Sequence, residues 1–274
     1  MKSPVPYFGG KQSIVDWIVR LLPDHDHYVE PFCGGLSVLF AKRPSRMETV
    51  NDLDAELMTF WRVLRDRPDE LLRACMLTPH GRAEHEATWD PTDDELELAR
   101  RIWCRLAQGR SGTLRRTGWR HYIDPAGSST SMPGYLEGYV MRLASAAERL
   151  HGVSLEALPA LDLIGKYGKH SRAMLYVDPP YLGSTRGWGR NYRHEMKTDL
   201  EHRELAAALA DCRAAVVLSG YDSPLYAQLY SGWHRYETAS TTGNAKTNRD
   251  RTEVLWANTE LGDQLDLFAQ EQTT

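Results

Sequence analysis

Two short, uninterrupted apolar runs constrain the fold of this chain more than any other feature. Residues 173–178 read Ala-Met-Leu-Tyr-Val-Asp, and residues 214–219 read Ala-Ala-Val-Val-Leu-Ser. Runs of this length without polar alternation are typical of parallel strands that are covered on both faces. Residues 27–32 and 47–51 are two further strand candidates. The sequence therefore predicts a buried, parallel sheet.

Helix signals occur in the intervals between these strands. Thr92 with Glu95, and Thr198 with Glu201, have the spacing of a capping box, in which the two side chains satisfy backbone groups at the start of a helix. Strands that alternate with helices indicate an α/β fold.

The segment 68–139 departs from this alternation. It holds an acidic block, a basic block and a stretch rich in Gly, Ser, Thr and Pro, and it offers no convincing apolar strand. We interpret it as a mainly helical insertion. The surrounding α/β domain would comprise residues 1–67 and 140–258, and residues 259–274 would form a C-terminal tail.

Charge is unevenly distributed along the chain. The formal net charge of the 274 residues is -4, which by itself does not indicate a polyanionic partner. Residues 84–98, however, contain seven acids and no lysine or arginine, whereas residues 100–120 contain seven arginines and no acid. A local cationic surface for phosphates is one interpretation. The alternative is a solvated helix face on which the arginines pair with the preceding acids.

Targeting, redox and metal signals are scarce. Four cysteines are too far apart for any CxxC pair, which argues against a zinc ribbon and favours a reducing compartment: Cys33, Cys75, Cys104 and Cys212. The N-terminus lacks an apolar signal segment, and no run of about 18 apolar residues occurs. We therefore expect a cytoplasmic protein that uses neither a membrane nor a metal.

A glycine turn follows the first strand candidate. Residues 30–35 read Glu-Pro-Phe-Cys-Gly-Gly, and glycines between a strand and a helix let the backbone approach a ligand closely. Asp52 stands about twenty residues further on, where a carboxylate can accept hydrogen bonds from both hydroxyls of a ribose. The pair favours a nucleotide-like ligand over a purely structural turn.

The tetrapeptide Asp178-Pro179-Pro180-Tyr181 ends the buried strand candidate at 173–178. Two prolines directly after a central strand cannot extend its hydrogen-bond ladder, so they hold the chain rigidly as it leaves the sheet. The Asp178 carboxylate and the Tyr181 ring would thereby be fixed at the carboxyl edge of the sheet.

A third motif, Tyr-Phe-Gly-Gly-Lys at residues 7–11, fits a surface turn when it is considered alone. The motifs together are more specific. Pro-Tyr-Phe-Gly-Gly-Lys, Glu-Pro-Phe-Cys-Gly-Gly, Asn-Asp-Leu-Asp, Tyr-Val-Asp-Pro-Pro-Tyr, Leu-Ser-Gly-Tyr-Asp-Ser and Glu-Val-Leu-Trp follow one another in the order of the DNA adenine methylase family. Over residues 4–258 the chain resembles these S-adenosylmethionine-dependent, N6-adenine-specific DNA methyltransferases, particularly their phage-like branch.

The resemblance implies a Rossmann-like class I methyltransferase sheet, S-adenosylmethionine as the cofactor, and a target-recognition role for the insertion. It implies that the cofactor is bound by Tyr7, Lys11, Glu30, Phe32, Gly34, Asp52 and Asp178, and that catalysis is carried out by Asp178, Pro179, Pro180 and Tyr181. Asp178 and the Pro179 carbonyl can accept hydrogen bonds from the adenine amino group, while Tyr181 would stack on the flipped base. Such direct transfer needs no metal and no covalent enzyme intermediate.

Basic residues in three segments are candidates for contacts with double-stranded DNA: Arg110, Arg115, Arg116 and Arg120 in the insertion, Arg186 and Arg190 after the tetrapeptide, and Lys246 and Arg249 nearer the C-terminus. The tail resembles the short peptide that docks bacterial DNA-processing proteins on the replication sliding clamp, with Gln264, Leu265, Leu267 and Phe268 as candidate contacts. Packing of these residues on their own domain is the alternative.

Two other functions remain open at this point. Related tetrapeptides serve amino-methyltransferases that act on RNA or on protein glutamine, and a catalytically silent DNA-binding module could keep the same fold. The N-terminal lysine loop and the basic insertion favour DNA as the substrate. The intact tetrapeptide at 178–181 argues against a silent module.

Overall fold

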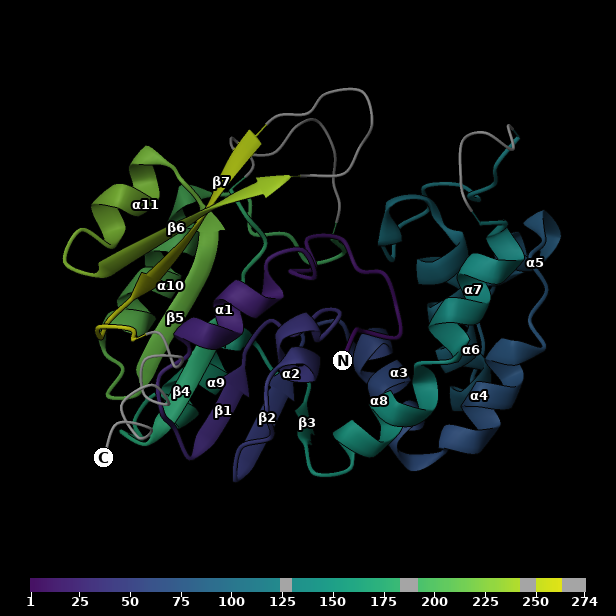
Figure 1. The fold of residues 1–274 in the computed structure, drawn as a ribbon, viewed down its shortest axis with the longest axis horizontal. Coiled ribbons are helices and arrows are strands. Elements are labelled where there is room, and N and C mark those ends of the chain that lie inside the picture. The colour runs from purple at the N-terminus through teal and green to yellow at the C-terminus, as the bar shows by residue number, and fades with distance from the viewer. Residues whose placement is uncertain (124–129, 183–191, 242–249, 263–274) are drawn as a thin grey trace, which may run out of the picture.

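Seven strands form one sheet in this computed structural model, which describes residues 1–123, 130–182, 192–241 and 250–262 (Figure 1). The strands are β1 (His27–Glu30), β2 (Met47–Asn51), β3 (Ser154–Glu156), β4 (Ala173–Val177), β5 (Ala215–Tyr221), β6 (His234–Thr241) and β7 (Asp250–Ala257). Their order is β3-β2-β1-β4-β5-β7-β6. Strands β1 to β5 are parallel, and β7 runs antiparallel between β5 and β6. The predicted Rossmann-like α/β fold is thus confirmed, with an antiparallel hairpin at one edge.

Helices cover both faces of the sheet (Figure 1). Helices α1 (Val15–Leu21) and α2 (Ser37–Ala41) share a core with one face, and α9 (Ala160–Tyr167), α10 (Asp199–Ala210) and α11 (Pro224–Leu229) share a core with the other. Strand β4 contributes Met174 and Tyr176 to the first core and Leu175 and Val177 to the second. Because both alternating sets of side chains are buried, both must be apolar, which explains the uninterrupted run in the sequence.

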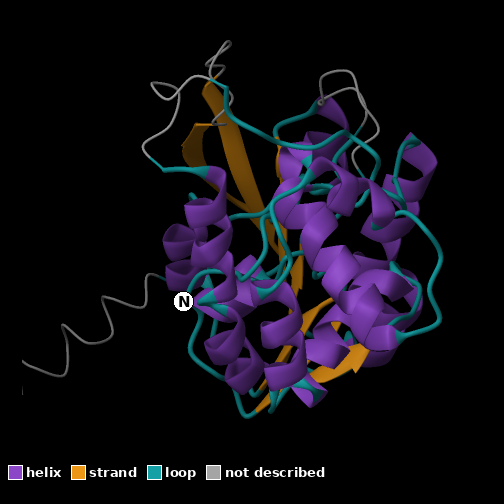
Figure 2. Ribbon diagram, turned by 90° about the vertical axis from the view of Figure 1, so that its right-hand side faces the viewer, coloured by secondary structure: helices purple, strands orange, loops and turns teal. Residues whose placement is uncertain are grey.

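The chain between β2 and β3 is helical. It contains α3 (Ala55–Asp66), α4 (Pro68–Met76), α5 (Arg82–Ala87), α6 (Glu95–Gln108), the 3-10 turn η1 (Arg110–Gly112), α7 (Met132–Val140) and α8 (Leu143–Leu150). Figure 2 views the molecule from this side, with these helices in front of the sheet. Trp61 of α3 and Trp103 of α6 are fully buried in the core that α1 and α2 also share. The predicted helical character of 68–139 is confirmed for the part of that segment that the structure describes.

One of the two predicted capping boxes is present. Thr198 and Glu201 satisfy each other's backbone groups at the start of α10. The prediction for Thr92 and Glu95 is wrong, because α6 begins one residue after Asp94, whose carboxylate accepts hydrogen bonds from two amides of the first turn. The charged acceptor directly before the helix is the stronger cap, and the Thr92 hydroxyl instead accepts a hydrogen bond from the Asp94 amide. Among the helices of the described residues, none has the length and apolar character needed to cross a membrane.

Candidate active site

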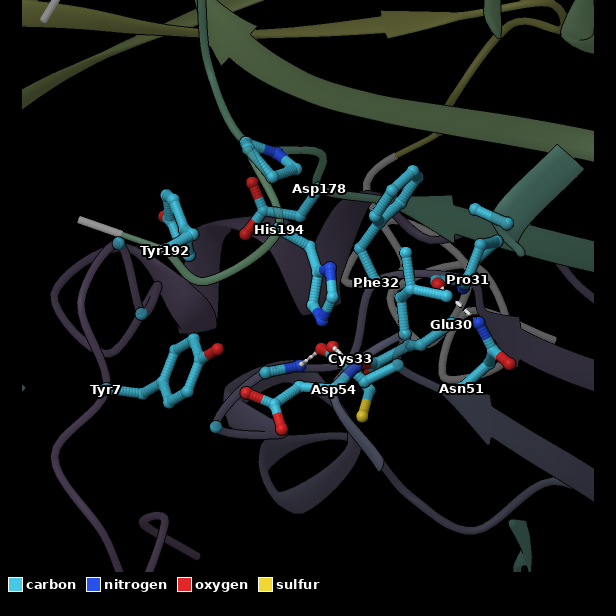
Figure 3. A pocket seen from close by; sticks show the side chains of 18 of the residues that line it. Tyr7, Glu30, Pro31, Phe32, Cys33, Asn51, Asp54, Asp178, Tyr192 and His194 are labelled. Carbon is cyan, nitrogen blue, oxygen red and sulfur yellow. Dashed lines mark hydrogen bonds between the residues drawn. The ribbon is translucent and has the colours of Figure 1, made fainter. Parts of the chain in front are cut away.

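A pocket opens at the carboxyl ends of the central strands, where the order of the sheet reverses. The chain leaves β1 toward β2 on one side, while β4 lies on the other side of β1, and a crevice forms at such a switch point. The pocket is lined by residues 7–11, 30–38, 51–54 and 192–196, and also by Asp178 and Pro180 (Figure 3). Motifs that are far apart in the sequence therefore meet at one edge of the sheet.

The glycine turn brings bare backbone to this pocket. Gly34 has a φ of 45°, and a Cβ at this position would lie 2.7 Å from Cε1 of Tyr7. Only glycine allows the Tyr7 ring to lie against the turn in this conformation. Trp61 also holds the turn in place, because its indole N–H donates a hydrogen bond to the Gly34 carbonyl at 3.1 Å. The missing side chain at Gly34 therefore makes room for the Tyr7 ring, which becomes part of the pocket wall.

Asp52 is oriented by the same turn. Its Oδ2 accepts a hydrogen bond from the Gly34 amide and its Oδ1 accepts one from the Asp54 amide, both at 3.0 Å. Burial raises the pKa of Asp52 to about 6, although the two amides oppose this shift. The carboxylate is thus ionised at neutral pH and keeps one lone pair on each oxygen for a ligand. Two adjacent hydroxyls, as on a ribose, fit this acceptor.

The buried Lys11 and the partly exposed Asp178 form an ion pair in the pocket wall. The Asp178 Oδ1 lies 2.8 Å from the Lys11 Nζ, which also donates to the Gly9 carbonyl at 3.0 Å. Burial would lower the pKa of Lys11, but the carboxylates of Asp178 and Glu253 raise it above its ordinary value, so the ammonium stays charged. Burial raises the pKa of Asp178, and Lys11 opposes that shift. The lysine that the resemblance assigns to the cofactor therefore touches the acid that begins the tetrapeptide 178–181.

Glu30 and Phe32 belong to the pocket wall. The Glu30 Oε1 accepts hydrogen bonds from the Tyr28 hydroxyl at 2.5 Å and from the Leu39 amide at 2.9 Å. Burial raises the pKa of Glu30 to about 8, so its carboxyl is largely protonated at neutral pH. Phe32 is half-buried and packs against the core that β4 shares with α9 and α10.

Tyr181 is held by a residue that sequence reasoning missed. Its hydroxyl donates to Glu253 of β7 and lies 3.2 Å from the Ser219 hydroxyl, and the Lys11 Nζ lies 4.7 Å from the centre of its ring. Glu253 itself is 3% exposed. The available signal was a lone acid at the start of the apolar stretch Glu-Val-Leu-Trp, whose proximity to the tetrapeptide depends on the sheet order.

Residues 192–196 also line the pocket. Arg193 anchors this segment: its guanidinium pairs with Asp54 at 3.2 Å and donates to the Leu114 carbonyl at 3.2 Å. Tyr192 packs on the N-terminal loop, and Figure 3 shows the His194 ring directed into the pocket. The segment therefore connects the pocket with the helical insertion.

The insertion arginines divide into two groups. Arg100 pairs with Glu84 and Glu97, and Arg101 also pairs with Glu97. Arg105 is buried, and its guanidinium donates a hydrogen bond to the Thr88 carbonyl and forms an ion pair with Glu56. For Arg100 and Arg101, the interpretation as arginines that pair with the preceding acids applies. Arg105 differs, because it is buried and its acid, Glu56, lies outside the acidic block.

The four insertion arginines predicted to contact DNA follow in the chain. Arg110 and Arg116 are exposed and Arg115 is half-buried; the Arg116 guanidinium also lies 3.5 Å from the exposed Glu86 carboxylate. Arg120 serves the fold, since its guanidinium lies 4.1 Å from the Tyr135 ring centre and donates to a carbonyl of α6 at 3.1 Å. The other predicted contacts lie outside the described residues: Arg186, Arg190, Lys246, Arg249, Gln264, Leu265, Leu267 and Phe268.

Several known proteins are similar to this chain. A family model described as D12 class N6 adenine-specific DNA methyltransferase matches residues 7–96. The Type II methyltransferase M1.LlaDCHI of Lactococcus lactis subsp. cremoris is 26% identical over 275 residues, which cover 91% of this chain and 93% of that protein. The DNA N-6-adenine-methyltransferase of Escherichia phage P1 is 23% identical over 84% of this chain, and modification methylase LlaI of Lactococcus lactis subsp. lactis is 24% identical over 70%. The matched regions cover 31% and 32% of these two longer relatives.

Among solved structures, a SAM-dependent methyltransferase from Agrobacterium tumefaciens superposes on 93% of this chain and 64% of its own, with a TM-score of 0.40 and 8% identity. The fold assignment rests on the strand order instead.

The strand order and the switch-point pocket define a Rossmann-like fold with a ligand pocket at the carboxyl edge of its sheet. The chain is similar to the D12 class of N6-adenine-specific DNA methyltransferases, whose family model matches residues 7–96, and to adenine methyltransferases along most of its length. Its methyl donor is S-adenosylmethionine, and the residues present fit this cofactor. The Gly34 turn and the ionised Asp52 would hold its nucleoside half, with Tyr7 beside them.

Proposed function

We propose that the protein transfers the methyl group of S-adenosylmethionine to N6 of adenine in double-stranded DNA, at specific sequences. The position of Asp178 is the main support for this proposal. It stands at the end of β4 and lines the same pocket as Asp52 and Gly34. A base placed at Asp178 and a cofactor ribose placed at Asp52 would share one pocket, as direct transfer between them requires.

The chain's own groups can activate the acceptor. Adenine N6 is a poor nucleophile because its lone pair is delocalised into the ring. The Asp178 carboxylate and the Pro179 carbonyl can accept hydrogen bonds from N6, which localises the lone pair and aligns it for attack. The bound cofactor supplies an electrophilic methyl group on a sulfonium. As the N6–methyl bond forms, the bond between that carbon and sulfur breaks, and the nitrogen then loses one proton.

Access to this pocket requires base flipping. An adenine inside a duplex cannot reach Asp178, so the target nucleotide would rotate out at a cost of a few kcal/mol. Stacking on Tyr181 would offset part of this cost. The ring of Tyr181 is already fixed by its hydroxyl bond to Glu253, so little further ordering is needed when a base arrives.

Exposed arginines of the insertion would hold the DNA. Arg110, Arg115 and Arg116 are the candidates among the described residues, because none of them is buried. Arg186, Arg190, Lys246 and Arg249 are further candidates on sequence grounds. The tail peptide that ends at Phe268 is proposed, again on sequence grounds, to dock on a bacterial sliding clamp, and loss of clamp affinity in Phe268→Ala would test this.

One experiment tests the catalytic proposal. The protein is incubated with S-adenosylmethionine and adenine-containing duplex DNA, and N6-methyladenine is mapped by sequencing. We expect methylation at one short sequence, abolished in Asp178→Ala and retained in Asp211→Ala, which alters an exposed acid at the end of α10.

The other outcomes identify the competing functions. Methylation of RNA or of a protein glutamine, with DNA left unmodified, would replace DNA as the substrate. No methylation together with no calorimetric binding of the cofactor would indicate a silent DNA-binding module.

A further inference from the structure

A buried carboxylate on β7 lies beside the catalytic pair. Glu253 is opposite Tyr221 of β5 in the antiparallel register, and its side chain is 4% exposed. One of its oxygens, Oε1, accepts hydrogen bonds from the Tyr181 hydroxyl and, at 3.2 Å, from the Ser219 hydroxyl. The same oxygen lies 3.5 Å from the Lys11 Nζ. A single carboxylate thus contacts both the tetrapeptide and the lysine that pairs with its acid.

The charges around Lys11 do not cancel. One ammonium lies between two carboxylates, at 2.8 Å from Asp178 and 3.5 Å from Glu253, so the ionised cluster carries one net negative charge. Without Glu253, the ammonium and Asp178 would form a neutral pair. An amino group that accepts a methyl cation becomes positively charged, and a buried negative cluster stabilises that charge more than a neutral pair does.

Lys11 also competes with the substrate for Asp178. An ammonium that is bound by only one carboxylate draws strongly on the lone pairs of that carboxylate, and those lone pairs are what adenine N6 needs. Glu253 shares the same ammonium, at 3.5 Å from its Nζ. It also fixes the Tyr181 ring by accepting its hydroxyl proton.

We propose that Glu253 is a positioning residue for methyl transfer, which shares Lys11 with Asp178, keeps the cluster net negative and sets the orientation of Tyr181. This inference rests on the proposed function and extends it to a residue of the edge hairpin. Glu253 acts through Lys11 and Tyr181 and need not touch the base.

The role predicts a change in pH dependence. The groups that face Asp178 are Lys11 from the N-terminal loop, Tyr176 and Tyr181 from its own segment, Glu30 from β1 and Glu253 from β7. Burial raises the pKa of Asp178, and the negative charge of Glu253 raises it further. Asp178 must be ionised to accept from N6, so removing the Glu253 charge should move the acid limb of activity to lower pH.

The test compares Glu253→Gln with Glu253→Asp and with Glu237→Gln, which alters an exposed acid of β6 in the same hairpin. Single-turnover methylation of duplex DNA is measured from about pH 5 to 9, and the affinity for S-adenosylhomocysteine is measured by calorimetry. In Glu253→Gln we expect a rate loss of about tenfold to a hundredfold. The acid limb should fall by about one pH unit, while the affinity for S-adenosylhomocysteine changes by less than about twofold. Glu253→Asp keeps the charge and should keep the wild-type acid limb, and Glu237→Gln should match wild type throughout.

A rate in Glu253→Gln equal to wild type, or a lower rate with an unmoved acid limb, would overturn the inference. If thermal melting shows that Glu253→Gln does not fold, Tyr181→Phe removes the hydroxyl donor alone, and an unchanged rate in that variant would overturn it instead. Wild-type protein that yields no N6-methyladenine would refute the proposed function itself, so the two failures are distinguishable.

Discussion

At the carboxyl edge of the sheet, charged side chains are buried and take partners from distant parts of the chain, whereas in the arginine-rich part of the insertion they divide into a paired half and an exposed half. Lys11 contacts Asp178 and Glu253, which lie more than 150 residues away in sequence. Arg100 instead pairs with acids of its own neighbourhood at 2.5 and 2.6 Å, whereas Arg116 makes only a longer contact of 3.5 Å with Glu86 and its side chain is 64% exposed.

The two regions differ in the free-energy cost of an unpaired charge. A buried ion without a partner would cost several kcal/mol, so the charges of the pocket exist only as a connected set. An exposed guanidinium costs little and remains available to a phosphate. A substitution in the first region should therefore alter chemistry, and one in the second should alter either stability or DNA affinity, depending on the group.

Asp178→Asn should have the largest effect. The amide keeps the size of the side chain but loses the charge that binds Lys11 at 2.8 Å and that, in the proposed reaction, accepts hydrogen bonds from N6. We expect the single-turnover rate of methyl transfer to fall by about 10²–10³-fold. Calorimetric affinity for the cofactor should change by no more than a few fold. A variant that retains a tenth of the wild-type rate would contradict the assigned role, and Asp211→Asn provides the matched control.

Asp52→Asn should have the next largest effect, and on binding. Loss of hydrogen bonds to a charged acceptor costs about 1.5–3 kcal/mol, so cofactor affinity should fall by roughly 10- to 150-fold. Calorimetry would measure this loss at pH 7.5.

The pH dependence of binding provides a second measurement on Asp52. Because its pKa is about 6, the wild-type carboxylate is ionised above that pH and becomes protonated below it. Wild-type affinity should therefore weaken as the pH falls from 7 to 5. A similar decline in Asp52→Asn would show that another group is responsible.

Much of the catalytic region could be predicted from the sequence because its constraints are local. A strand buried on both faces must be apolar throughout, so β4 and β5 were visible as continuous runs. The turn at Gly34 needs glycine for its positive φ. The carboxyl ends of parallel strands, where the motifs stand, lie at the same edge of the sheet. Asp52 and Asp178 were therefore expected in one pocket, and both line it.

The remaining parts depend on tertiary contacts. Glu253 lies beside Tyr181 because β7 inserts between β5 and β6, which no spacing in the sequence specifies. The sequence of residues 100–120 also does not predict which of its arginines are exposed. Arg105 is buried on a carbonyl and Arg120 stacks on Tyr135, although both carry the same charge as the exposed Arg116.

Charge reversal at Arg115 and Arg116 should weaken DNA binding and reduce its salt dependence. If each guanidinium neutralises one phosphate, the slope of log affinity against log salt should decrease in magnitude by about 0.9 for each phosphate that is no longer neutralised. Affinity at low salt should fall by about tenfold or more, and the thermal midpoint should stay close to that of wild type, because neither side chain is buried. Filter binding or anisotropy over a range of salt concentrations would measure this, and an unchanged slope would remove these two residues from the DNA surface.

Arg100→Gln should produce the smallest effect and the opposite pattern. The Arg100 side chain is 17% exposed, and its guanidinium joins Glu84 on α5 to Glu97 on α6 at 2.5 and 2.6 Å. Removing it leaves two partly exposed carboxylates without their shared partner, which should lower the free energy of unfolding by about 1 kcal/mol. The salt slope for DNA should not change, because the guanidinium is already occupied by protein acids. Chemical denaturation and the same salt titration would measure both quantities. A lower salt slope with unaltered stability would show that Arg100 contacts DNA, and the distinction between paired and exposed arginines would then be wrong.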